Sequence, residues 1–349
     1  MVTSFERIMA AMMFQEADRV PAVPLILGVS RRVLGVSFQE WSLNPEIAAR
    51  AFLQTQELFG YDALFAAQDL SVEAADFGAK MVYPLEDVAH PDYDSPLIKE
   101  IEDYTQLKPF DPQAGPRMSG ILKMIEILLN TRGDRVPVLG FSNGPLCTLS
   151  MLRSSERLFR DCMKHPREIH AALEVITQVL VDYVRIQCQK GVPAVCIDVL
   201  YGARSTLSKK MWIEFEVPYA RRICDEIRKN GRAVALHNCG TGPYFDAMIE
   251  HLSPQAISYH YLPDDCKSNR ELKEKYGQKV TLIGHINCPN TLFFGKPGDV
   301  EGECQSLIQD LAPGGGFVLA SGCEFPPNAS LLNAKAIMEA ANRYGQYKH

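Results

Sequence analysis

The sequence lacks a long hydrophobic run, an excess of positive charge and a leader-like start. None of its apolar stretches approaches the roughly 20 residues of a membrane-spanning helix, so we expect no membrane span. Its net charge of -6 lacks the excess of positive charge that is typical of nucleic-acid-binding proteins. The apolar piece from Ile8 to Phe14 is short and lies between charged residues, which indicates a helix and not a signal peptide.

The sequence also shows no cysteine pattern of a disulfide framework. Its 10 cysteines are scattered along 349 residues, which favours reduced thiols and a cytoplasmic location. Hydrophobic residues make up 46% and charged residues 22%, proportions that are ordinary for a globular protein. The length allows one large domain or two ordinary ones, and we predict a single domain over residues 1–349.

Apolar stretches alternate with helical patterns along the whole chain, which predicts eight strands and the helices between them. The predicted strands are Arg19–Ile26, Asp62–Ala66, Arg135–Phe141, Ala194–Asp198, Val234–Leu236, Ala256–Tyr259, Val280–Gly284 and Phe317–Ala320. No Gly-x-Gly-x-x-Gly turn follows an early strand, as a dinucleotide-binding open sheet requires. We therefore predict a (β/α)8 TIM barrel.

The predicted helices begin with an N-terminal extension. Thr3 and Glu6 fit a capping box that opens a helix running to about Phe14. The further helices are predicted at 44–59, 117–130, 155–164, 166–190, 209–230, 242–252, 269–276, 299–311 and 331–344. Residues 78–116 are richer in Pro, Asp and Tyr, and we expect them to leave the regular layout.

Two predicted strands are each followed within three residues by a cysteine. His237 and Cys239 stand two positions apart, so in an extended chain they point to the same side. Cys323 follows the last predicted strand, and all barrel strands end at the same face. Two thiolates and one imidazole are the protein ligands of a catalytic zinc site with an open fourth position. The alternative also stays open, since free cysteine is commonly a small buried hydrophobe.

Several motifs together carry a family resemblance that spans nearly the whole chain. They are Glu6-Arg7 with Asp18-Arg19-Val20-Pro21, Phe141-Ser142-Asn143-Gly144-Pro145, Phe215-Glu216-Val217-Pro218-Tyr219, His237-Asn238-Cys239-Gly240, Gly284-His285-Ile286-Asn287 and Gly322-Cys323-Glu324-Phe325-Pro326-Pro327. The chain resembles the uroporphyrinogen decarboxylase superfamily, and within it the cobamide-dependent methyltransferases that methylate coenzyme M or related acceptors. The resemblance implies a barrel fold and a zinc ion held by His237, Cys239 and Cys323.

The chain also departs from the decarboxylases of that superfamily. Their Arg-Gln-x-Gly-Arg motif, which holds the acidic side chains of a tetrapyrrole, is absent from residues 27–32. Asp69 lies where the decarboxylases have an aspartate, but it stands without those arginines. His260 stands at a position where the family leads us to expect an acidic residue. The identity of the substrate therefore does not follow from the resemblance.

Other polar side chains at predicted strand ends are candidate substrate contacts. These are Asp69, Asn143, Asp198, Tyr201, His260 and His285. Glu324, beside Cys323, is a candidate fourth zinc ligand, although a solvent-facing or helix-capping carboxylate is the alternative interpretation.

The three candidate zinc ligands and the family resemblance together imply a zinc-dependent methyltransferase. It would move a methyl group between a corrinoid and a small-molecule thiol, methoxy or other methyl compound, in either direction. The Asp-x-His-x-x-Gly signature of corrinoid domains is absent, so methylcobalamin or cob(I)alamin would arrive on a partner protein. Two alternatives stay open: a metal-free lyase of the uroporphyrinogen decarboxylase type, and a non-catalytic zinc-binding partner of a corrinoid protein.

Overall fold

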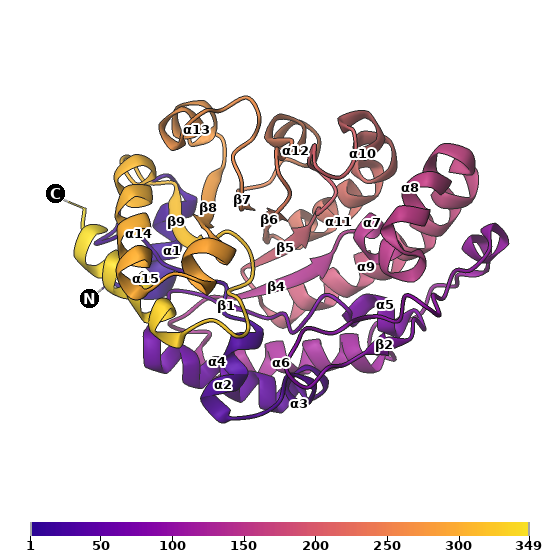
Figure 1. The fold of residues 1–349 in the computed structure, drawn as a ribbon, viewed down its shortest axis with the longest axis horizontal. Helices are drawn as coiled ribbons and strands as arrows, with labels where there is room; N and C mark the ends of the chain where they lie inside the picture. The colour runs from indigo at the N-terminus through magenta and orange to yellow at the C-terminus, as the bar shows by residue number, and fades with distance from the viewer. Residues whose placement is uncertain (1, 348–349) are drawn as a thin grey trace.

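A curled parallel sheet of seven strands forms the centre of the computed structural model, which describes residues 2–347 (Figure 1). All neighbouring strands pair in parallel, in the order β1-β4-β5-β6-β7-β8-β9. Their bounds are β1 Leu64–Phe65, β4 Val138–Asn143, β5 Ala194–Asp198, β6 Ala233–Asn238, β7 Ala256–Tyr259, β8 Thr281–Ile286 and β9 Phe317–Ser321. The mixed α/β architecture predicted from the alternating pattern is thus confirmed.

The eighth position of the barrel is filled by an extended segment that is not a regular strand. The Val23 N–H donates to the Leu319 carbonyl at 2.8 Å, on β9. On the other side, the Asp62 N–H donates to the Ala22 carbonyl at 2.9 Å, just before β1. The prediction of a strand over Arg19–Ile26 is therefore wrong in detail, because Pro21 and Pro24 lack the N–H groups that a continuous ladder needs.

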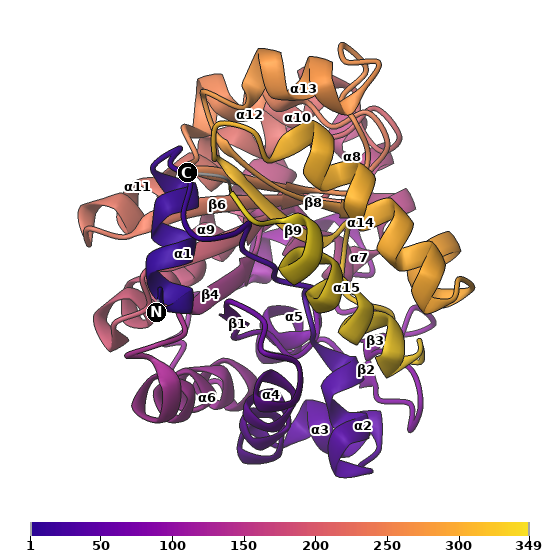
Figure 2. The same cartoon turned by 90° about the vertical axis from the view of Figure 1, so that its left-hand side faces the viewer.

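Helices surround the sheet and join successive strands (Figures 1 and 2). Their bounds are α1 Ser4–Met12, α2 Arg31–Leu34, α3 Phe38–Leu43, α4 Pro45–Phe59, α5 Val72–Asp76, α6 Pro116–Arg132, α7 Pro145–Arg153, α8 Ser155–Lys164, α9 Pro166–Lys190, α10 Lys209–Phe215, α11 Val217–Lys229, α12 Phe245–Leu252, α13 Asn269–Tyr276, α14 Pro297–Leu311 and α15 Leu331–Tyr344. Among the described residues, none of the helices is long and apolar enough to cross a membrane.

Several helix predictions hold and some need correction. The capping box of Thr3 and Glu6 is present, but α1 stops at Met12, and Phe14 has a φ of 56° that ends the helical path. The predicted helix over 209–230 is two helices, α10 and α11, because Pro218 in the first turn of α11 supplies no N–H to continue α10. Helix α7 was not predicted, although Pro145 at its first position is a typical helix start.

The region 78–116 leaves the barrel layout, as predicted. Its two short strands, β2 Met81–Val82 and β3 His90–Pro91, pair antiparallel with each other and not with the main sheet. A short 3₁₀ helix, Ile101–Gln106, follows before α6.

A buried charge network holds the N-terminal segment against the barrel. The side chain of Asp62 is fully buried and accepts hydrogen bonds from Arg7 and Arg19, each at 2.7 Å. It also accepts from the backbone N–H of Ala22 at 2.8 Å. The Glu6-Arg7 and Asp18-Arg19 motifs therefore include the two arginines that fix the segment closing the barrel.

Candidate metal centre

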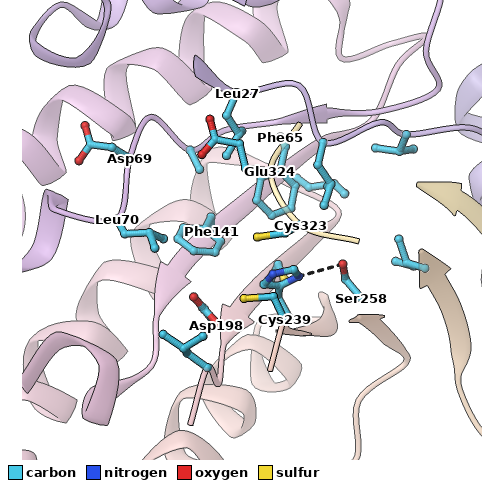
Figure 3. Close-up of a pocket in the computed structure, with 18 of the residues that line it drawn as sticks. Leu27, Phe65, Asp69, Leu70, Phe141, Asp198, Cys239, Ser258, Cys323 and Glu324 are labelled. Atoms are coloured by element: carbon cyan, nitrogen blue, oxygen red, sulfur yellow. Dashed lines mark hydrogen bonds between the residues drawn. The ribbon is translucent and has the colours of Figure 1, made fainter. Parts of the chain in front are cut away.

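A cavity of about 240 Å³ lies inside the barrel, toward the ends of the strands (Figure 3). Most of its wall is apolar. The lining residues are Val23, Leu25, Leu27, Phe65, Ala67, Asp69, Leu70, Leu139, Phe141, Cys196, Asp198, Leu200, His237, Cys239, Ser258, Ile283, Val318, Cys323 and Glu324. Within the described part of the chain, no lysine or arginine belongs to this lining.

Three side chains with metal-ligating atoms meet in the cavity wall. His237 lies on β6, Cys239 follows that strand directly, and Cys323 follows β9. One ligand atom from each residue lies within 4.8 Å of those of the other two. The barrel thus brings together the residues that strand-end geometry singled out in the sequence.

The donor set and spacing fit a zinc ion. Tetrahedral zinc with its usual Zn–S and Zn–N bonds holds its ligand atoms roughly 3.5–3.8 Å apart. Since the three donor atoms already lie within 4.8 Å of one another, small side-chain rotations reach that spacing. Three protein ligands facing a cavity correspond to a catalytic site, in which the fourth position stays open.

The imidazole of His237 is oriented by a residue that lies outside all the sequence motifs named above. Its Nδ1 lies 3.0 Å from the hydroxyl of Ser258, which is the paired residue on the neighbouring strand β7 (Figure 3). A hydrogen bond at Nδ1 leaves Nε2 available as the ligand atom, as in most histidine metal sites.

Replacing Ser258 by alanine is expected to lower zinc affinity by about 10- to 100-fold, because the imidazole loses the hydrogen bond that fixes its orientation. Competition with a chromophoric chelator measures this affinity, and thermal melting checks that the fold persists. Ser119→Ala, on the outer helix α6, serves as the control and should leave affinity unchanged. Equal zinc affinity in Ser258→Ala and wild type would contradict the positioning role.

Asn238 and Gly322 shape the loops that carry the ligand candidates. Asn238 turns away from the cavity and donates to the carbonyls of Val199 and Leu200 at 2.7 and 3.1 Å. It also accepts from the Gly240 N–H at 3.0 Å, which fixes the turn around Cys239. At the other loop, a Cβ on Gly322 would lie 2.6 Å from the His260 ring, so only glycine lets the chain pass there.

The two cysteines influence each other's protonation. Hydrogen bonding from the Cys239 thiol, with a further contribution from His237, holds the pKa of Cys323 well below its usual range. The same contact raises the pKa of Cys239. A divalent cation bound to both sulfurs would deprotonate both thiols.

Two carboxyl groups in the wall have raised pKa values. Burial raises the pKa of Asp198 to about 6, although His237 opposes the change. Burial also raises the pKa of Glu324 to about 8, against the effect of the Gly28 N–H that donates to it at 2.9 Å. Glu324 lies outside the three-residue group, so the structure gives three ligand candidates and places this carboxylate in the wall beside them.

Asp69 and Asp198, two of the predicted substrate contacts, line the cavity. Asp69 is already engaged, because Arg117 donates to it at 2.7 Å and Ser71 and Ser42 also hydrogen-bond to it. Asp198 is different, since its buried Oδ1 has no hydrogen-bond partner among the described residues.

The other four predicted contacts do not belong to the lining. Asn143 donates to Glu73 and to the Leu70 carbonyl, both at 2.8 Å. The Tyr201 hydroxyl bonds two serines, and His285 Nε2 lies 2.8 Å from Asn269 Oδ1. His260 stacks on Tyr261 with ring centroids 4.2 Å apart. Substrate contact by these residues stays a prediction.

Sequence reasoning missed the residues that orient the ligand candidates and form the apolar wall. Ser258, Phe65 and Phe141 all lie within strands. A single serine or phenylalanine in a strand carries no signal of which face it takes in a closed barrel. Two available signals were motif positions: Phe141 begins the Phe-Ser-Asn-Gly-Pro motif, and Asn238 stands between two ligand candidates in the His-Asn-Cys-Gly motif.

Comparison with known proteins identifies the family. The profile described as Uroporphyrinogen decarboxylase (URO-D) matches residues 3–344. The chain belongs to this family.

Individual relatives have two different activities. Uroporphyrinogen decarboxylase of Methylococcus capsulatus is 25% identical over 324 residues, covering 90% of this chain and 88% of that protein. Methylcobamide:CoM methyltransferase MtaA of Methanosarcina barkeri is 23% identical over 341 residues, covering 97% of each. A solved methyltransferase from Methanosarcina mazei has a TM-score of 0.81 at 21% identity and covers 99% of each chain, which shows a shared fold. The activity must therefore be argued from the site.

Proposed function

We propose that this protein is a zinc-dependent methyltransferase that moves a methyl group between a corrinoid on a partner protein and a small molecule. The observation that carries the proposal is the meeting of His237, Cys239 and Cys323 in the wall of an apolar cavity. The relatives include methylcobamide:CoM methyltransferases that match over nearly the full chain, which supports the same class of reaction.

The cavity favours this function over decarboxylation of a tetrapyrrole. A substrate with four pyrrole rings and many carboxylates needs cationic partners, because buried charge without a partner is costly. The described cavity lining contains none. Arg31 instead bonds Glu86 and Asn328, at 2.7 and 2.9 Å, and Arg32 bonds the Ala329 carbonyl.

The protein's own residues have distinct roles in this proposal. His237, Cys239 and Cys323 would hold zinc, and Ser258 orients the imidazole. Bound zinc supplies a Lewis acid that deprotonates a thiol or polarises an ether oxygen. The apolar side chains exclude water and thereby strengthen electrostatic interactions inside the cavity. A separate protein would carry the corrinoid.

Elemental analysis together with a methyl-exchange assay tests the proposal. We expect about one zinc per chain and methyl exchange between the zinc-loaded protein, a methylcobamide and members of a panel of thiols and methoxy compounds. Zinc without any methyl exchange would leave the non-catalytic zinc-binding alternative. Carefully purified protein without zinc affinity would return the chain to the metal-free lyase.

A further inference from the structure

Cys239 and Cys323 differ from the other cysteines in how accessible they are. All ten cysteines are free thiols, and all except these two are buried. Both line the cavity, and Figure 3 shows their side chains in its wall. A small solute that enters the cavity can therefore reach these two thiols more easily than the buried ones.

The two sulfurs lie close enough for a bond to form between them. Their Sγ atoms are within 4.8 Å of each other, whereas the S–S distance of a disulfide is about 2.05 Å. The sulfurs must therefore approach by at most about 2.8 Å. The change of one cysteine side chain from one staggered rotamer to another moves its Sγ by about 3 Å. Side-chain rotation is thus large enough to close the distance.

The backbone at both cysteines is held by hydrogen bonds that such a rotation leaves intact. The side-chain oxygen of Asn238 accepts from the Gly240 N–H at 3.0 Å, which fixes the turn around Cys239. On the other loop, the Ser321 hydroxyl donates to the Cys323 carbonyl at 2.6 Å. The two loops therefore keep the thiols together by their own contacts, whether or not a metal joins them.

One further thiol lies beside the pair and is its natural competitor. Cys288 Sγ is 3.7 Å from the carbonyl oxygen of Cys323 and 3.8 Å from that of Ile286. Cys288 is 7% exposed, and it does not belong to the three-residue ligand group. A test of the pair must therefore distinguish a bond between Cys239 and Cys323 from one between Cys288 and Cys323.

The pair can hold a metal or form a disulfide, but it cannot do both. Cysteine binds zinc through its thiolate, and a sulfur in a disulfide no longer carries that charge. Oxidation of both sulfurs would leave His237 as the one remaining member of the ligand group. Formation of the disulfide does not depend on the proposed function, whereas its effect on zinc binding rests on it.

We propose that Cys239 and Cys323 form a redox switch, in which a peroxide converts the two thiols to a disulfide and a dithiol reverses the change. One sulfur attacks an oxygen of hydrogen peroxide, the O–O bond breaks, and a sulfenic acid and one water form. The second sulfur attacks the sulfenic sulfur, the S–S bond forms, and the hydroxyl leaves as water with the thiol proton. Together the two thiols lose two electrons and two protons, and hydrogen peroxide is reduced to two waters.

Peroxide treatment of metal-free protein tests the switch by mass spectrometry. After equimolar hydrogen peroxide, denaturation and alkylation, we expect the number of alkylated cysteines to fall by two from ten. The peptide map should show one cross-linked pair, containing Cys239 and Cys323, and dithiothreitol should release it. Zinc binding should fall from about one per chain to none on oxidation and return after reduction.

The matched control is Cys288→Ala, which should form the same disulfide because its thiol is not part of the pair. Cys239→Ser and Cys323→Ser should form no such cross-link, and circular dichroism checks that each variant is folded. The wild-type peptide map decides the question even if a variant does not fold. A Cys288–Cys323 disulfide, or separate sulfinic acids on Cys239 and Cys323 without a disulfide, would overturn the switch.

Bound zinc should protect the pair from oxidation. At a free zinc concentration of about ten times Kd, roughly one chain in eleven is metal-free, so the disulfide should form about tenfold more slowly. Equal rates with and without bound zinc would overturn the switch as a control of metal binding. Absence of zinc affinity would overturn the proposed function instead, and the peptide map of metal-free protein would still decide whether the disulfide forms.

Discussion

Cys323→Ala is expected to lose zinc and, with it, methyl transfer. Removing an outer hydrogen bond to a metal ligand costs about 10- to 100-fold in affinity, so removal of a ligand itself should lower zinc affinity by more than about 100-fold. Cys323 is also the sulfur that holds a proton least tightly, since hydrogen bonding from Cys239 lowers its pKa. The measurements are zinc content after dialysis and the rate of methyl exchange; Cys239→Ala should behave alike.

The matched control is a neighbouring thiol that is not a ligand candidate. Cys288 is buried, and its Sγ lies 3.7 Å from the Cys323 carbonyl. Cys288→Ala therefore changes packing beside the site while keeping the three ligand candidates, and it should retain zinc. If Cys323→Ala kept its full zinc content, or if Cys288→Ala lost as much zinc as Cys323→Ala, the assignment of the three ligands would be wrong.

Asp62→Ala is expected to destabilise the fold by about 3–5 kcal/mol, the usual result of removing one partner from a buried ion pair. Its carboxylate bonds Arg7, Arg19 and the Ala22 N–H within 2.8 Å. Alanine would leave two buried guanidinium groups without this partner and free the segment that fills the eighth barrel position. Urea unfolding followed by circular dichroism measures the free energy.

An exposed ion pair gives the comparison for Asp62. Arg204 and Asp264 contact each other at 2.5 Å, but their side chains are 61% and 54% exposed. Asp264→Ala should therefore cost only about 0–1 kcal/mol. Similar losses in Asp62→Ala and Asp264→Ala would show that the buried network does not hold the barrel closed.

Local sequence patterns predicted the regular elements well. Helices α8, α9, α13 and α15 and strands β5 and β7 have the predicted bounds. In α9, apolar residues recur at helical spacing and Gly191 ends the helix in the left-handed conformation. Such signals depend only on a residue and its neighbours within a few turns, so they can be recognised without knowledge of the fold.

Predictions failed where proline or a long-range contact decided the backbone. Arg19–Ile26 has the apolar character of a strand, but its prolines limit it to a few hydrogen bonds with Leu319 and Asp62. The stretch 209–230 reads as one helix, yet Pro218 starts a second helix inside it. The region 78–116 was correctly set apart, although its hairpin was not located.

Strand-end reasoning predicted part of the site. The convergence of His237, Cys239 and Cys323 follows from alternation in an extended chain and from the common face of parallel strand ends. Asn143 and His285 hydrogen-bond to Glu73 and Asn269 and lie outside the described cavity lining, so their contact with a substrate stays a prediction. A strand end gives a residue access to the barrel mouth but does not fix where its side chain turns.

The sequence by itself determined the order of most elements and which three residues are candidate ligands. It also showed that the tetrapyrrole-binding arginine motif is absent. These features depend on residue type and spacing along the chain. Only the tertiary structure decided that Ser258 orients His237, that Arg31 is engaged by Glu86, and that the described cavity lining is apolar and without cations. Such properties arise from contacts between residues far apart in sequence, and closure of the barrel alone selects which side chains share its interior.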